Sequence, residues 1–227
     1  MEHAARSAVP VFPLPEIVLF PTISVPLHIF ELRYRTMVRD ALSRGRTLAL
    51  ALLAPGYEED YHGSPQYHEL GCLGHIEEVE WLPNDRYNLT LRGMHRVRFG
   101  EVEREFPYRL ARVEPLPQDP WTEDDPLLLM EKRTLLKLHA RLAALAEAQG
   151  DAATRAALPA ATADDSFERV VNSLGTVCGR SAEERLELLR IDSLIDRARV
   201  VREALERLLG APGPLPKPGG DGGEQRN

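Results

Sequence analysis

The sequence has little of several features on which common protein classes depend. Its 227 residues include two cysteines, Cys72 and Cys178, far fewer than the cysteine framework of small disulfide-stabilised domains. The longest apolar run, residues 48–55, is about eight residues long, well short of the roughly 20 that cross a bilayer. Residues 1–10 lack the cationic patch and apolar core of a signal peptide. We therefore expect a cytoplasmic protein with two reduced thiols and no membrane segment.

Lysine is almost absent, and this limits the possible enzymes. Lys132, Lys137 and Lys217 are the three lysines of the chain. No phosphate-binding G-x-x-x-x-G-K-[ST] motif and no G-x-S-x-G motif occurs. Lys132 and Lys137 lie in a leucine-rich segment, where salt bridging or solvation is the simpler role. These absences argue against nucleotide hydrolysis and Ser–Lys catalysis, and we expect no cofactor.

The chain also lacks an excess of basic charge. Its net charge is -7, and residues 1–115 contain 13 arginines against 16 acidic residues. Binding to nucleic acid phosphates requires the opposite balance. Arg92, Arg96 and Arg98 could share one face of a strand with aromatic neighbours, as in a sheet that stacks bases. Acidic residues flank them, so paired surface charge is the better interpretation, and nucleic-acid binding is kept only as an alternative.

Composition divides the sequence into three regions. Residues 9–116 consist of short apolar segments, prolines and turns, and residues 117–210 are rich in Ala, Leu, Arg and Glu. The last 17 residues, 211–227, contain five glycines and four prolines and have almost nothing to bury. We predict a β domain, a helical domain and a disordered tail with these bounds.

The first region has the pattern of a small β domain with one helix. Residues 87–93 alternate between apolar and polar side chains, as a half-buried strand does, and residues 47–54 form a continuous apolar run typical of a fully buried strand. In residues 31–45 the apolar positions follow the helical spacing instead, and Gly45 ends that helix. About six strands without βαβ alternation favour a closed or half-closed antiparallel barrel in an α+β fold.

The second region predicts four helices. Apolar side chains recur at helical spacing from Pro126 to Gly150, after Asp164 and Asp165, after Ser181 and up to Gly210. Asp164 or Asp165 is the expected N-cap of the second helix, and Ser181 begins a capping box. Short connections favour a small antiparallel bundle or helices laid on the barrel.

Ligand-type residues at His68, Cys72 and His75 suggest a metal site at first sight. In a strand, however, residues 72 and 75 point to opposite faces, and residues 68 and 72 lie about 13 Å apart. We therefore expect no metal, and Cys72 is interpreted as a small buried hydrophobe. Neither cysteine has an adjacent base that would make it a nucleophile. A small hydrolase with an unrecognised site remains a further alternative.

Two blocks of sequence are more specific than any single residue. The first contains Leu-Phe-Pro at 19–21 and Pro-Leu-His-Ile-Phe-Glu-Leu-Arg-Tyr at 26–34. The second contains Gly71, Gly74 and Ile76, followed by Arg-Tyr-Asn-Leu-Thr-Leu-Arg-Gly at 86–93. In this order and at this separation they resemble the Lon N-terminal domain, the substrate-binding domain of Lon-type proteases. The resemblance covers residues 9–116 well and the helices more weakly.

The resemblance implies a PUA-like β-barrel followed by a helical bundle, and a role in recognising protein segments. The ATPase and Ser–Lys peptidase modules of a Lon protease have no counterpart in this sequence. The chain therefore resembles a stand-alone, non-catalytic form of the domain. Its expected partners are unfolded or partly folded protein segments, with a protease or chaperone as a further partner, and the oligomeric state stays open.

A domain that binds apolar peptide needs an uncovered apolar surface or a free strand edge. The candidate edges are the strands at 11–20 and 108–114. Glu31, Arg33 and Tyr34 are expected to be structural, because Glu31 lies where the dipole of the predicted helix favours negative charge. The candidate peptide-binding residues are the expected surface aromatics Phe20, Tyr57, Tyr61, Tyr67 and Trp81.

Overall fold

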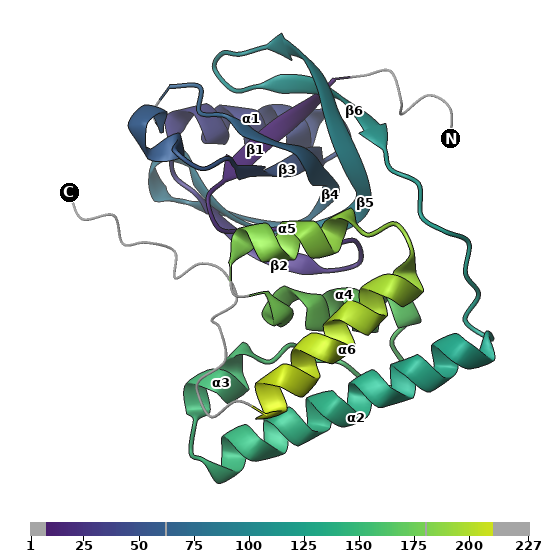
Figure 1. The fold of residues 1–227 in the computed structure, drawn as a ribbon. Coiled ribbons are helices and arrows are strands. Elements are labelled where there is room, and N and C mark those ends of the chain that lie inside the picture. The colour runs from purple at the N-terminus through teal and green to yellow at the C-terminus, as the bar shows by residue number, and fades with distance from the viewer. Residues whose placement is uncertain (1–7, 62, 180, 211–227) are drawn as a thin grey trace. The chain divides into compact units, whose positions relative to one another are not determined.

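The computed structural model describes residues 8–61, 63–179 and 181–210. The chain divides after Pro117 into two compact units, which we call the β domain and the helical domain (Figure 1). The predicted tail, residues 211–227, lies outside the described residues.

Six strands form one mixed sheet in the β domain. They are β1 (Val9–Leu14), β2 (Ser24–Ile29), β3 (Thr47–Leu53), β4 (Tyr67–Leu82), β5 (Arg86–Arg104) and β6 (Leu110–Pro115). Their order is β2-β5-β4-β3-β1-β6, and β5 also pairs with β6, so five strands close a barrel and β2 lies outside it. The α+β fold class predicted from the sequence is confirmed.

One pairing differs from the antiparallel barrel that we expected. β1 and β3 run parallel, whereas every other pairing between the described strands is antiparallel. Parallel neighbours need a long connection between them, and here β2 and the helix α1 (Leu32–Ser43) supply it. The pattern of the isolated strands contains no signal for this pairing.

Strand β3 is buried on both faces, which explains its continuous apolar sequence. Leu48 and Leu50 belong to a core that also contains the buried face of α1. Ala49 and Ala51 point the other way, into a second core formed with residues of β1, β5 and β6. A strand between two cores cannot alternate with polar residues, because both of its faces exclude water.

Helix α1 covers the larger core with the face that its sequence predicts. Tyr34, Met37, Val38 and Ala41 are buried. The helix ends before Gly45, whose φ of 99° lies in the left-handed region that glycine adopts without strain.

Strand β5 is crossed at Gly93 by the chain segment that leads into β2. The Gly93 amide donates to the Ile23 carbonyl at 2.8 Å, and the Thr22 amide donates to the Gly93 carbonyl at 2.8 Å. A Cβ atom on Gly93 would lie 2.1 Å from the Phe20 carbonyl oxygen. The crossing therefore depends on the absence of a side chain at this position.

We expect Gly93→Ala to lower the free energy of unfolding by more than about 2 kcal/mol, since the clash involves backbone atoms that cannot rotate away. The matched control is Gly100→Ala on the same strand, where the nearest atom to an added Cβ lies 3.6 Å away. Urea unfolding of both variants tests this. Equal stabilities of the two variants would contradict the close crossing.

The helical domain contains α2 (Pro126–Ala148), α3 (Ala152–Ala157), α4 (Phe167–Cys178), α5 (Ala182–Arg190) and α6 (Leu194–Gly210) (Figure 1). Helices α2, α4, α5 and α6 correspond to the four predicted helices, and the short α3 was not predicted. Helix α2 packs against both α4 and α6. The N-cap of α4 is Ser166, whose hydroxyl accepts from the Arg169 amide, so the expectation of Asp164 or Asp165 was wrong.

A buried arginine inside this domain could not be found from the pattern of apolar residues. Arg197 is fully buried in α6 and donates to Asn172 Oδ1 at 2.8 Å and to the Ile191 carbonyl at 2.6 Å. These acceptors connect α4, α6 and the α5–α6 turn. A buried guanidinium is tolerated where such acceptors are already in place.

Candidate functional site

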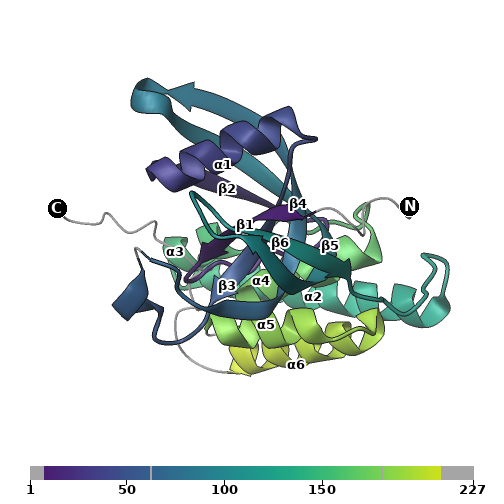
Figure 2. The same ribbon diagram turned by 90° about the horizontal axis from the view of Figure 1, so that it is seen from above.

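Beyond the closed barrel, β2 and the ends of β4 and β5 form a three-stranded extension. It consists of β2, the first half of β5 and the second half of β4, and Figure 2 shows the paired ends of β4 and β5 reaching beyond the other strands, with α1 beside them. Ile29, Tyr87 and Trp81 lie side by side in one row across the three strands. One face of the extension packs with α1 in the larger core, which leaves the other face open.

The open face of the extension carries a shallow hollow of about 550 Å³ with both polar and apolar residues in its lining. The Asn88 side chain donates to Glu80 Oε2 at 2.8 Å, so its Oδ1 atom accepts from His28 Nδ1 at 2.7 Å. Glu78 and Thr90 line the hollow beside this chain of hydrogen bonds. With two carboxylates and no basic side chain except His28, the hollow favours neutral or cationic groups.

Strand β2 is a free edge. Among the described residues it pairs with β5 alone, so one side of its backbone has no strand partner. Pro26 lies in the middle of β2, and proline is tolerated in a strand where its missing N–H faces outward. A strand that pairs with this edge would therefore lack one backbone N–H donor at Pro26. Proline at an edge limits uncontrolled strand addition while leaving short contacts possible.

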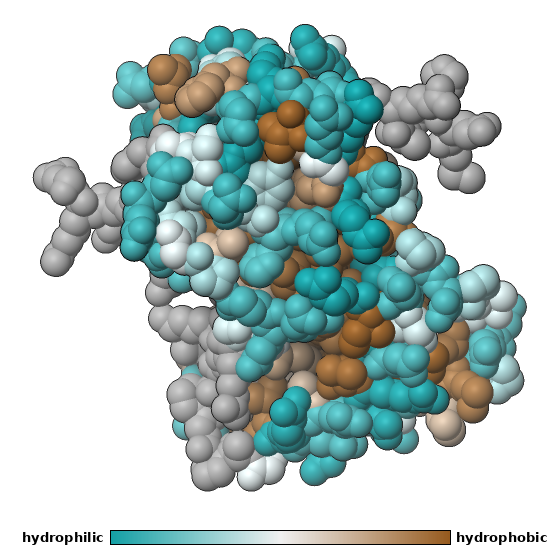
Figure 3. Space-filling model, turned by 45° about the horizontal axis from the view of Figure 1, so that its top comes forward, coloured by the Kyte–Doolittle hydropathy of each residue, from teal (hydrophilic) through white to brown (hydrophobic). Residues whose placement is uncertain are grey.

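Large apolar side chains are exposed at the end of the extension, Phe30 and Leu32 between β2 and α1 and Trp81 near the end of β4. Phe30 is 52% exposed, Leu32 70% and Trp81 63%. We call these three residues the tip patch. The Trp81 ring leans edge-on against buried Tyr87, with 4.9 Å between ring centroids, so its orientation is fixed although most of its surface faces solvent. In the upper part of the face drawn in Figure 3, hydrophobic residues lie singly or in small groups among hydrophilic ones.

Arg33 anchors the loop that follows β3 to the start of α1. Its Nε donates to Glu31 Oε2 at 3.0 Å, and its terminal nitrogens donate to the carbonyls of Tyr61 at 3.0 Å and Gly63 at 3.2 Å. The guanidinium also lies over the Tyr34 ring, 4.6 Å from its centroid. Glu31 is the N-cap residue of α1 rather than part of its first turn, and its carboxylate serves Arg33 instead of capping the helix. These contacts hold the loop against the start of α1.

Removing this anchor should release the loop without unfolding the domain. We expect Arg33→Ala to speed cleavage after Glu58 and Glu59 by glutamyl endopeptidase about tenfold, because hydrogen bonds from a charged group are each worth about 1.5–3 kcal/mol. Mass spectrometry of timed digests measures the rate at this loop. The control is Arg39→Ala on the same helix, whose exposed side chain lies 3.9 Å from Asp85. Equal cleavage rates in the two variants would contradict the role of Arg33.

Comparison with known proteins agrees with this architecture. Residues 8–207 match the family model of the ATP-dependent protease La (LON) substrate-binding domain. The chain belongs to the Lon substrate-binding domain family. It is 26% identical over 198 residues to Lon protease 2 of Herpetosiphon aurantiacus and 29% identical over 111 residues to Lon protease 2 of Sorangium cellulosum.

Solved Lon domains share the fold. The N-terminal domain of Mycobacterium avium complex Lon protease aligns with 88% of this chain and 98% of its own at a TM-score of 0.59 and 15% identity. A Lon N-terminal domain protein from Xanthomonas campestris aligns with 89% of this chain and 97% of its own at a TM-score of 0.53 and 24% identity. The match to Herpetosiphon Lon protease 2 spans 87% of this chain but 24% of that protein, and the match to the Sorangium protease spans 49% and 14%.

The structure separates the aromatic residues expected at the surface of this Lon domain. Phe20 is fully buried, so its assignment to an exposed surface was wrong. The segment that contains it crosses β5 at Gly93, and this crossing draws the ring into the domain. Tyr57 and Tyr61 are half-buried and lie 6.2 Å apart between ring centroids, Tyr67 is half-buried in β4, and Trp81 belongs to the exposed tip patch.

The expected strand edges were also wrong. β1 pairs with β3 and β6, and β6 pairs with β1 and β5, so neither is a free edge. The number of prolines in residues 10–21 had suggested an edge. The pairing of β1 with β6 involves two residue pairs, so few donors are required of the proline-rich strand.

Sequence analysis missed Phe30, Leu32 and Phe106 as exposed residues. Phe30 could have been found from the alternation of β2, in which Leu27 and Ile29 are buried and the residues between them are exposed. Continuing that alternation places Phe30 outward. Phe106 is 74% exposed in the loop between β5 and β6, and no periodic pattern covers that loop.

Neither cysteine has the surroundings of a nucleophile. Cys72 is fully buried in the larger core, and Cys178 lies at the end of α4. Burial raises the pKa of the Cys178 thiol to about 12. At neutral pH this thiol is protonated and therefore unreactive.

Both thiols should be protected in the folded protein. We expect far less than one thiol per chain to react with Ellman's reagent within minutes at pH 8, and two per chain to react after denaturation. The denatured sample is the internal control. Rapid reaction of one thiol in the native protein would contradict the burial of Cys72 or the raised pKa of Cys178.

Two further features bear on the chemistry of this Lon domain. Within residues 8–61, 63–179 and 181–210, no group of three or more His, Cys, Asp and Glu side chains could hold a metal ion. No helix in the same ranges has the length and apolar character needed to span a membrane.

Proposed function

We propose that this Lon-family domain binds exposed apolar segments of unfolded or partly folded proteins on the tip patch and the adjoining edge of β2, without catalysing a reaction itself. The observation that supports this most strongly is the exposure of Phe30, Leu32 and Trp81. They are three of the four large apolar residues in the described β domain that are more than half exposed. A protease or chaperone is the class of partner that would receive the bound segment.

The tip patch can supply useful binding energy. An aromatic side chain buries about 150–250 Å² when covered, and burial contributes roughly 25 cal/mol per Å². Since Phe30 and Trp81 are already partly covered, each ring can add on the order of 1–2 kcal/mol. A few such contacts give weak, reversible binding, which suits a domain that must accept many sequences.

The surroundings of the patch bias which segments fit. Glu77, Glu78 and Glu80 lie on β4 close to Trp81, and the neighbouring hollow also favours neutral or cationic groups. The edge of β2 can add a short ladder that Pro26 interrupts. We expect apolar segments flanked by lysine or arginine to bind better than those flanked by acidic residues.

The test uses a permanently unfolded protein, reduced and carboxamidomethylated α-lactalbumin, labelled with a fluorophore and titrated with the full chain. Fluorescence anisotropy should show saturable binding. Phe30→Ser and Trp81→Ser should each weaken it about tenfold, the equivalent of 1.4 kcal/mol.

The matched control is Met130→Ser, which removes a side chain of similar exposure, 59%, from α2 in the helical domain. Thermal unfolding confirms that each variant is folded. Binding that is unchanged in both tip variants, or reduced equally by Met130→Ser, would contradict the proposal.

A further inference from the structure

Arg109 is a nearly buried cation whose side chain donates no hydrogen bond to a described residue. The residue is 9% exposed and precedes β6. Its guanidinium lies over the Tyr67 ring, 5.0 Å from the centroid, and the nearest carboxylate oxygen, Glu105 Oε2, is 3.9 Å from its Nε. That separation is an ion pair without a hydrogen bond. A guanidinium carries five N–H donors, and those of Arg109 meet no acceptor among the described residues.

The other buried arginines each donate to an acceptor of the chain. Four arginines are buried in the described ranges. Arg96 donates to the Pro117 carbonyl, Arg185 to the Gly179 carbonyl and Arg197 to Asn172 and Ile191. Arg109 alone among the four has no such acceptor, and its charge is balanced by the ion pair with Glu105 and the contact with the Tyr67 ring.

Arg109 lines two separate hollows. Both are lined by Ser64, Glu105 and Arg109. The smaller, about 50 Å³, also has Tyr34 in its wall. The Tyr34 hydroxyl donates to no described residue, and burial raises its pKa to about 12, so it keeps its proton at neutral pH. The smaller hollow therefore presents a cation, its ion-pair partner Glu105 and a hydroxyl donor.

The larger hollow, about 260 Å³, has a mainly polar lining that includes a few apolar side chains. Tyr67, Phe99 and Val102 line it beside Arg109. Its volume is below the roughly 300–1,000 Å³ of a drug-sized pocket, so it has room for about one side chain. The two hollows share Ser64, Glu105 and Arg109, and apolar side chains line part of each.

We propose that these hollows bind the carboxyl terminus of a polypeptide that ends in an apolar residue. The α-carboxylate accepts from Arg109 and from the Tyr34 hydroxyl, and the last side chain lies against Phe99 and Val102. Carboxylate is the anion that matches the planar donor fork of arginine. The end of a polypeptide leaves a binding site in one direction only, whereas an internal segment must leave it in two. Two small hollows therefore accommodate a chain end better than an internal segment.

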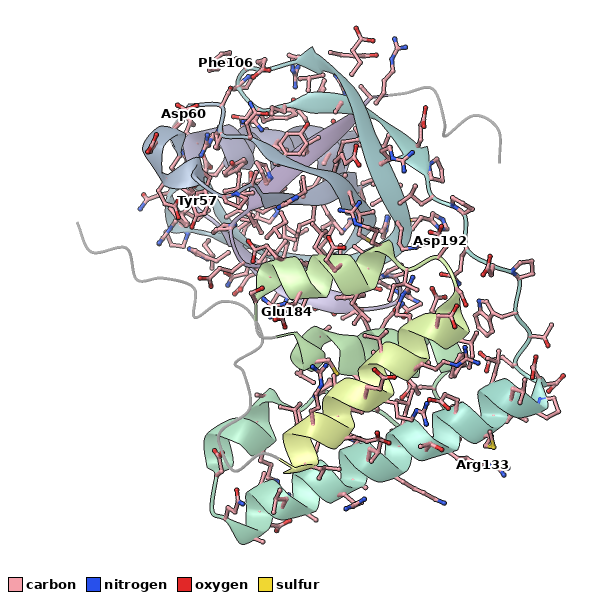
Figure 4. The ribbon with its side chains drawn as sticks, viewed as in Figure 1. Tyr57, Asp60, Phe106, Arg133, Glu184 and Asp192 are labelled. Carbon is pink, nitrogen blue, oxygen red and sulfur yellow. The ribbon has the colours of Figure 1, made fainter. Side chains whose placement is uncertain are left out.

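The rim of the site sets a second requirement. Glu69 and Glu105 line the larger hollow, and Glu58, Glu59 and Asp60 form the short helix η2 (Tyr57–Asp60) in the anchored loop. Figure 4 shows Tyr57 and Asp60 of this loop and Phe106 of the β5–β6 loop on one side of the β domain. The Ser64 hydroxyl joins the two loops by donating to Glu105 Oε2 at 2.7 Å. Carboxylates at the rim repel acidic residues upstream of the terminus and favour lysine or arginine there.

This inference rests on the proposed binding of polypeptides, but it uses a different surface from the tip patch. Three fluorescein-labelled peptides of the same lysine-containing sequence separate the possible sources of the carboxylate. One ends in Ala-Leu with a free carboxylate, one is its C-terminal amide, and one is an amide that ends in Ala-Glu. Anisotropy titration with the full chain should give at least tenfold tighter binding for the free acid than for either amide.

Variants identify the groups responsible. Arg109→Met keeps an apolar stem over Tyr67 and should abolish the preference for the free acid, and Tyr34→Phe should reduce it several-fold. Arg112→Met is the matched control, since Arg112 is exposed on β6 and pairs with Glu103 at 2.7 Å. Should Arg109→Met fail to fold, Tyr34→Phe alone still decides whether the donors of this hollow matter.

Each alternative result has a defined meaning. Equal binding of the free acid and the two amides overturns terminus recognition but leaves the tip-patch proposal standing. Tighter binding of the peptide ending in Ala-Glu as an amide also overturns it, in favour of a side-chain carboxylate site. Absence of peptide binding, with unfolded α-lactalbumin still bound, rejects the terminus site alone, whereas absence of both rejects the proposed function as well.

Discussion

One edge of strand β5 is shared between two partners, and the architecture of the β domain depends on this division. The first half of the edge pairs with β2 and the second half with β6, while β4 follows the other edge along most of its length. The pairing with β6 closes the barrel. The pairing with β2 cannot close anything, because β2 has no second strand partner among the described residues. Gly93 lies where one partner gives way to the other.

This division accounts for where the domain can be stable and where it can bind. Closure removes free edges from five strands, so the barrel offers little backbone for strand addition. The extension retains a free edge, and the packing of α1 on one of its faces keeps it ordered. The exposed ring of Trp81 lies on this supported extension, and Phe30 directly follows β2 and stacks on His28, so little conformational entropy is lost when the two rings are covered.

Local sequence patterns predicted most of the helices and strands, but they did not predict which strands pair with each other. The buried face of α1 and the continuous apolar run of β3 follow from periodicity, because burial on one or two faces is recorded in the spacing of side chains. Which strand is an edge depends on residues distant in sequence. Thus β1 was expected at an edge because of its prolines, and β2 was not. Phe20 was misassigned and Phe30 was missed for the same reason. Phe20 is buried because its segment crosses β5, and Phe30 is exposed because it continues the alternation of the edge strand β2.

The candidate sites differ in the same way. Trp81 could be named from the sequence, because an aromatic residue beside acidic ones near a turn is often exposed. The environment of Arg109 could not, since its unused donors become visible only when the acceptors of the other buried arginines are compared. A charged residue in a strand-like sequence gives no sign of whether it will be paired. Sequence therefore located the proposed aromatic surface in part and the proposed carboxylate site not at all.

Hydrogen–deuterium exchange of the full chain, with and without saturating unfolded α-lactalbumin, tests most directly whether the extension is the binding surface. Binding there should slow exchange in residues 24–32 and around Trp81 and leave β3, in the barrel, unchanged. Slowed exchange confined to the closed barrel or to the helical domain, with none in β2, would contradict the account.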